Sequence, residues 1–187
     1  MQIRSRIRAL RFALSLWAVS MLLPGCSDEY YATTRAFLKF TPVTAVHSLY
    51  TALNNPGMFC RVTIGTTHFH FSDAEGQNAT YPLTALAAYG RPECLAGFVI
   101  GTPSLPDLNM GQQPVAYDLV CPTCYQHDLI QRSLDFSARE KLSCPRCQSV
   151  YDLTTGTLHS GKSDAVRLLY RYKITYSPAN DLVLVIN

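Results

Sequence analysis

The chain has 187 residues, 48% of them hydrophobic and 16% charged, which predicts one globular domain with a sizeable core. Its formal net charge is +3, but four of the 16 basic residues are arginines within the first 25 positions. The other 162 residues hold 12 basic and 13 acidic side chains, a net charge of −1. This balance provides no basic surface for nucleic acid, so we expect no nucleic-acid partner.

Residues 1–25 have the pattern of a signal peptide. A basic start is followed by an apolar run over residues 12–23, which is too short for a stable transmembrane helix. The run ends in Leu-Leu-Pro-Gly-Cys, which resembles a bacterial lipobox and would make Cys26 the lipidated first residue of the mature protein. The pattern predicts a cell-envelope lipoprotein bound to the membrane through Cys26. The alternative, an uncleaved N-terminal anchor, also places the domain in the envelope.

Residues 26–35 are predicted to be a lipidated tether. Because no aspartate directly follows Cys26, inner-membrane retention is not signalled, and we expect an outer-membrane lipoprotein. Asp28 and Glu29 resemble the surface-export signal of some Gram-negative lipoproteins, or they are simply part of a solvated tether. The sequence therefore leaves open whether the domain is periplasmic or surface-exposed.

From residue 36 onward, short strands separated by turn residues predict an all-β, mainly antiparallel protein. We expect short helices over 44–53 and 82–89. The strands are expected at 36–40, 59–64, 67–71, 95–100, 115–120, 129–136, 141–143, 168–176 and 182–186. Apolar and polar residues alternate most clearly in the strand at 168–176.

Two Cys-x-x-Cys sequences, nineteen residues apart, carry the strongest chemical signal. Cys121 and Cys124 form what we call the first hook, and Cys144 and Cys147 form the second hook. Each hook has a proline after its first cysteine, which stiffens the turn. Two such hooks can bring four thiolates around one metal centre. His127 lies three residues after the first hook. It is either a metal ligand in place of one of the cysteines or, as we favour, a polar loop residue.

The residues that begin with the second hook resemble a known family. Residues 144–156 read Cys-Pro-Arg-Cys-Gln-Ser-Val-Tyr-Asp-Leu-Thr-Thr-Gly, similar to the second cluster loop of Rieske ferredoxins, Cys-Pro-x-His-Gly-Ser-x-Phe-Asp-Leu-x-Thr-Gly. The resemblance covers about the last 75 residues. It implies a Rieske-like β-sandwich over residues 36–187, with a small two-loop metal-binding subdomain at about 115–160. It also implies that Ser149 and Tyr151 hydrogen-bond the cluster or its ligand.

The ligands differ from those of the family, whose cluster has two cysteines and two histidines. Here Cys147 replaces the second histidine, and Cys124 stands one residue beyond the position of the first. Four thiolates suit an all-Cys [2Fe–2S] cluster, a single iron or Zn²⁺. The leading interpretation is an electron-transfer protein with an unidentified redox partner. The alternative is a zinc-stabilised, non-redox binding lipoprotein.

Other residue patterns carry less chemistry. Cys60 and Cys94 are candidates for a disulfide in an oxidising envelope, or Cys60 is a buried free thiol. His68 and His70 share a strand face, which suits a second metal site or, as we favour, an exposed surface. The hooks could instead be two local disulfides, but such bridges would not join one hook to the other. We see no catalytic motif and expect a protein that is not an enzyme.

Overall fold

The computed structural model describes residues 31–84, 90–106 and 111–187. The predicted signal peptide, the lipidation site Cys26 and most of the helix expected over 82–89 lie outside these residues. Residues from Tyr31 to the end form one compact unit. Within its described part, no helix is long and apolar enough to cross a membrane.

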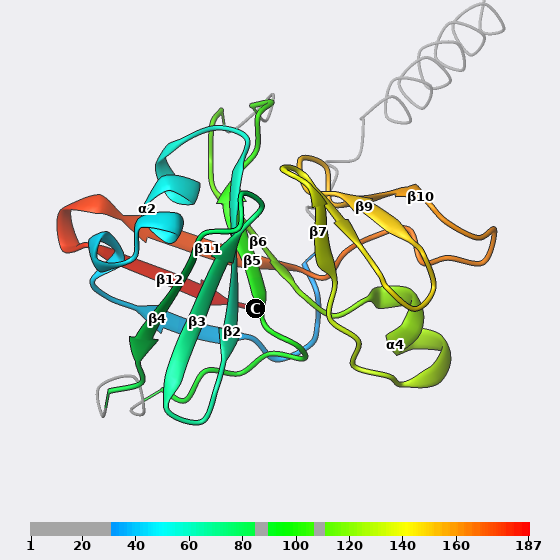
Figure 1. Cartoon of the computed structure of the whole chain (residues 1–187), viewed down its shortest axis with the longest axis horizontal. Helices are drawn as coiled ribbons and strands as arrows, with labels where there is room; N and C mark the ends of the chain where they lie inside the picture. The colour runs from blue at the N-terminus through cyan, green and yellow to red at the C-terminus, as the bar shows by residue number, and fades with distance from the viewer. Residues whose placement is uncertain (1–30, 85–89, 107–110) are drawn as a thin grey trace, which may run out of the picture. The chain divides into compact units, whose positions relative to one another are not determined.

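The larger of the two sheets is antiparallel and has eight strands (Figure 1). In chain order they are β1 Phe37–Phe40, β2 Met58–Ile64, β3 His68–Asp73, β4 Asn78–Pro82, β5 Phe98–Thr102, β6 Val115–Asp118, β11 Arg171–Ser177 and β12 Leu182–Ile186. Their order in the sheet is β1-β12-β11-β6-β5-β2-β3-β4. The sheet is curled, so that its first and last strands come close to each other. Phe40 on β1 packs edge-on against Tyr81 on β4, with ring centroids 5.2 Å apart.

A second antiparallel sheet has four strands in the order β10-β9-β8-β7. They are β7 Asp135–Ala138, β8 Lys141–Ser143, β9 Val150–Asp152 and β10 Thr157–Ser160. The described residues also form helices α2 His47–Asn54 and α4 Pro122–Asp128 and the 3-10 turns η1 Val43–Ala45 and η2 Pro178–Asn180. Helix α4 connects the larger sheet to the smaller one along the chain (Figure 1).

The predicted all-β, mainly antiparallel fold class is confirmed. The helix expected over 44–53 is present as η1 and α2, and the strands expected at 59–64 and 67–71 are β2 and β3, which pair as a hairpin. Several local expectations were wrong. The strands expected from residues 95 and 168 begin only at Phe98 and Arg171. Pro82 ends strand β4 instead of starting a helix, and the strand expected over 129–136 begins only at Asp135.

The apolar residues form two cores, one on each face of the larger sheet. Alternation along β5 sends Phe98 and Ile100 into the core that contains helix α2, and Val99 into the other. This second core also contains Tyr151 of the smaller sheet and three of the four hook cysteines, Cys121, Cys124 and Cys144. The hooks are therefore part of the apolar packing between the two sheets.

Candidate metal centre

The first hook is built on the start of helix α4. Cys121 is the N-cap residue and a proline follows at the first helical position, where its missing N–H costs no hydrogen bond. The Cys121 N–H donates to the carbonyl of Arg132 at 2.7 Å, and its carbonyl accepts the N–H of Tyr125 at 3.0 Å. One helical turn therefore brings the sulfurs of Cys121 and Cys124 to the same side.

The second hook is a tight turn between β8 and β9. The Cys144 carbonyl accepts the N–H of Gln148 at 3.0 Å, and the Cys144 N–H donates to the carbonyl of Ser149 at 2.9 Å. Gln148 has φ +64°, in the left-handed region, at the position where the Rieske sequence has glycine. Its side-chain amide donates to the carbonyl of Pro145 at 3.1 Å, which helps to close the turn.

The four sulfur atoms converge on one point. Cys121 Sγ lies 3.5 Å from Cys147 Sγ, Cys124 Sγ lies 3.7 Å from Cys144 Sγ, and all four lie within 4.8 Å of one another. Sulfurs about 2.3 Å from one tetrahedral ion are about 3.8 Å apart. In a [2Fe–2S] cluster the two pairs of thiolates bind different irons, which spreads them further. The spacing therefore fits a single ion best.

No other group of three or more potential metal ligands is found among the described residues. The cysteines Cys121, Cys124 and Cys144 are buried, and Cys147 is partly buried. With all four ligand positions taken by sulfur, a bound ion would have no open coordination position for a substrate. The arrangement can therefore hold a metal ion with four cysteine ligands.

The thiols of the hooks differ in how easily they ionise. Burial raises the pKa of Cys124 to about 11 and raises that of Cys121 further. Burial also raises the pKa of Cys147, but hydrogen bonds from the Ser149 hydroxyl and N–H, together with contacts to the Cys121 and Cys144 thiols, outweigh burial and lower this pKa to about 7. The Ser149 Oγ lies 3.3 Å from Cys147 Sγ. Metal binding must therefore displace protons, most easily from Cys147.

Tyr151, the other residue predicted to bond the cluster or its ligand, has different partners. Its hydroxyl lies 2.9 Å from Thr123 Oγ1 and donates to the carbonyl of Val166 at 3.1 Å. The Val166 N–H in turn donates to Thr123 Oγ1 at 3.0 Å. Sequence reasoning missed Thr123, because a threonine between two hook cysteines carries no signal of its own.

A buried carboxylate, Asp118, supports the chain where it enters the first hook. It accepts the backbone N–H groups of Leu95, Ala96 and Val120 at 2.9, 3.2 and 2.8 Å. The Tyr172 hydroxyl donates to it at 3.0 Å. Burial raises the pKa of Asp118, and these donors act against that shift. The sequence signal for this residue is a lone aspartate at the end of an apolar strand.

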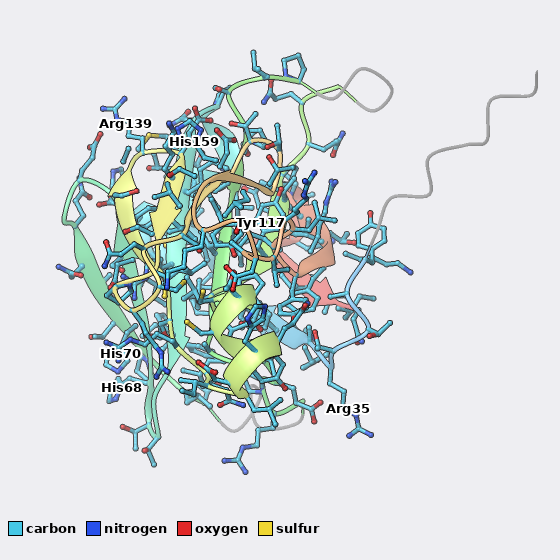
Figure 2. All side chains as sticks on the ribbon, turned by 90° about the vertical axis from the view of Figure 1, so that its right-hand side faces the viewer. Arg35, His68, His70, Tyr117, Arg139 and His159 are labelled. Atoms are coloured by element: carbon cyan, nitrogen blue, oxygen red, sulfur yellow. The ribbon has the colours of Figure 1, made fainter. Side chains whose placement is uncertain are left out.

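The remaining predicted residues lie elsewhere. Cys60 and Cys94 are free thiols, and burial raises the pKa of each to about 12. His68 and His70 are exposed on β3, and Figure 2 shows them next to each other. The Nδ1 of His127 lies 4.0 Å from a carboxylate oxygen of Asp164.

The sequence matches no protein-family model and no curated protein. The Rieske-like resemblance of residues 144–156 therefore stays a prediction. The structure establishes a coarser result: a mainly antiparallel β protein in which four cysteines are placed to hold a metal ion.

Proposed function

We propose that the two hooks hold one tetrahedral metal ion, Zn²⁺, with a structural role. The observation that carries this proposal is the spacing of the sulfurs, which all lie within 4.8 Å of one another. Zn²⁺ prefers four-coordinate thiolate sites and has no redox chemistry, so a closed four-cysteine site suits it. The ion contributes to folding because its ligands are far apart in an unfolded chain.

The position of the hooks supports a structural role. The first hook follows β6 of the larger sheet, and the second hook connects β8 and β9 of the smaller sheet. An ion bound by both hooks would join the two sheets at the core that they share. We further propose that this domain belongs to a cell-envelope lipoprotein attached to the outer membrane through Cys26. The basic start, the short apolar run and the Leu-Leu-Pro-Gly-Cys sequence support this.

Electron transfer is the second candidate function, with iron or a [2Fe–2S] cluster bound by the same four cysteines. The Ser149 hydroxyl, 3.3 Å from Cys147 Sγ, favours it, because hydrogen bonds to ligand sulfurs tune reduction potentials. Cys147 is also the only partly buried ligand, so a redox partner would approach there. The resemblance of residues 144–156 to a Rieske loop supports the same candidate.

Metal content separates the two candidates. The mature protein is extracted anaerobically in detergent from cells supplied with both iron and zinc, and metals, acid-labile sulfide and the visible spectrum are measured. One zinc per chain and no colour is the expected result. One iron, or two irons with sulfide and visible bands, would instead establish the electron-transfer candidate. Neither metal, with all four hook thiols oxidised, would overturn both.

A further inference from the structure

Three hydrogen bonds close a ring between the two hooks without using a cysteine. The Val166 N–H donates to Thr123 Oγ1 at 3.0 Å, and the Tyr151 hydroxyl donates to the Val166 carbonyl at 3.1 Å. Because the Tyr151 proton is used in this way, the 2.9 Å contact between the hydroxyls is a bond donated by Thr123 to Tyr151. We call Thr123, Tyr151 and Val166 the hydrogen-bond ring.

The members of the ring come from both sides of the metal centre. Thr123 lies inside the first hook, next to Cys124, and Tyr151 lies on β9, the strand that follows the second hook. The ring therefore sets the position of one hook relative to the other through contacts that do not depend on a metal ion.

The two side chains of the ring are buried, whereas Val166 is partly exposed. Tyr151 is fully buried and Thr123 is 8% exposed. A buried polar group that loses its partner destabilises the protein, whereas an exposed group can replace the lost hydrogen bond with one to water. Each hydroxyl of the ring has its partners inside the protein, so the ring favours one arrangement of the hooks. The apolar packing of Leu134 and Leu142 in the same core supports that arrangement.

We propose that the hydrogen-bond ring preforms the metal centre, with Thr123 and Tyr151 as positioning residues for the ligand sulfurs. The hooks face each other before the ion arrives, so the protein can release and reload its metal without unfolding. Small metal domains without such contacts are unfolded when the metal is absent. This inference rests on the proposed function, in that the hooks hold one ion.

The experiment compares the full-length protein in detergent with Thr123→Val, Tyr151→Phe and the double variant. Zinc affinity is measured by competition with a chromophoric chelator. We expect each single variant to bind zinc about 10-fold more weakly, because the hooks lose a contact that holds their sulfurs in position. Because both residues act in one ring, the double variant should lose little more. Thr123→Ser, which keeps the hydroxyl, should restore the affinity.

The matched control is Thr102→Val. Thr102 is also a buried threonine, 4% exposed, and its hydroxyl donates to the Leu53 carbonyl at 3.1 Å, but it lies outside the hooks. We expect it to lower the free energy of unfolding without changing zinc affinity. Ring variants that bind zinc as tightly as the wild type would overturn the inference.

A second measurement keeps the inference separate from the metal proposal. In metal-free wild-type protein we expect a nuclear Overhauser effect between the Thr123 methyl group and the Tyr151 ring. Its absence would overturn the preformed site whatever the zinc affinity. If the effect is present but the wild-type protein binds no zinc, the proposed zinc function fails while the preformed arrangement of the hooks stands.

Discussion

Cys121 Sγ and Cys147 Sγ lie 3.5 Å apart, although 26 positions separate the two residues in the chain. Cys124 and Cys144 are related in the same way, at 3.7 Å and 20 positions. Each sulfur of the first hook therefore contacts a sulfur of the second hook. Removing one cysteine therefore removes one of these two contacts between the hooks, in addition to changing the hook in which that cysteine lies.

A substitution of Cys144 tests this relationship. Cys144 is fully buried, and Cys144→Ser would replace a soft thiolate with a hydroxyl, which is a poor zinc ligand. We expect the metal content to fall from one ion per chain to almost none, and proteases to cut the smaller sheet faster. Cys60→Ser is the control, since Cys60 is equally buried but lies outside the hooks. Unchanged metal content in Cys144→Ser would show that this residue is not a ligand.

Metal removal should lower stability without abolishing the fold. An ion that binds only the folded state stabilises it by about 4 kcal/mol when its free concentration is about 1,000 times Kd. We expect a chelator to lower the midpoint of thermal unfolding and added zinc to restore it. A midpoint that does not respond to chelation of verified bound metal would argue against a structural ion.

Asp118→Ala should be among the most destabilising single changes outside the hooks. It leaves the buried N–H of Val120 and the partly buried N–H of Leu95 without their acceptor, and each such loss costs about 1–3 kcal/mol. We expect a loss of about 3 kcal/mol in the free energy of unfolding, measured with urea. Asp118→Asn keeps one acceptor oxygen and should cost less. Equal losses would indicate that the negative charge matters more than the acceptors.

Gly156→Ala should destabilise the protein for two reasons, a strained backbone conformation and a steric clash. Gly156 has φ +70°, and an added Cβ would lie 2.8 Å from Cε1 of Tyr117, a buried ring. Gly76 is a matched control, since its φ is +84° and a Cβ would meet nothing within 4 Å. We expect the free energy of unfolding to fall by about 1 kcal/mol in Gly76→Ala and by about 3 kcal/mol in Gly156→Ala. Similar losses in the two variants would mean that Tyr117 moves aside readily.

The raised pKa values of the Cys60 and Cys94 thiols predict that the folded protein loses stability at alkaline pH. Burial raises both pKa values from 9.0 to about 12, so folding favours the protonated thiols. Their contribution to stability is complete below pH 9 and is lost as the pH rises toward 12. Alkylation mapped by mass spectrometry should find the fully buried Cys60 unreactive at pH 8 in the folded protein and reactive in guanidinium chloride. Cys94 is partly buried and should react more slowly in the folded protein than in guanidinium chloride. Rapid labelling of Cys60 in folded protein at pH 8 would contradict its burial.

The hook cysteines and the principal hairpins could be predicted from sequence because their signals are local. The spacing within Cys-x-x-Cys fixes how two sulfurs approach each other, and alternating residues fix the faces of a strand such as β11. Helix α4 was not predicted, because its seven residues have no apolar period. Its start is marked by a proline at the first helical position, and the Cys121 N–H is bonded to the carbonyl of Arg132, which lies beyond the helix.

Features that depend on distant pairing were missed. The edge-on contact of Phe40 with Tyr81 arises from the curl of the whole sheet, which no short window of sequence encodes. The hydrogen-bond ring was missed for a similar reason, since Val166 takes part only through its backbone. A backbone group has no residue-type signal, so only the structure identifies it as a partner of Thr123.

The short separation of the two hooks has a consequence for the order in which the chain folds. Bringing Cys124 to Cys144 closes a loop of only about 20 residues, whereas β1 pairs with β12 at the opposite end of the domain. The entropy lost on closing a loop grows with its length. We therefore expect the smaller sheet and its hooks to assemble early, while β1 can pair only after β12 has been synthesised.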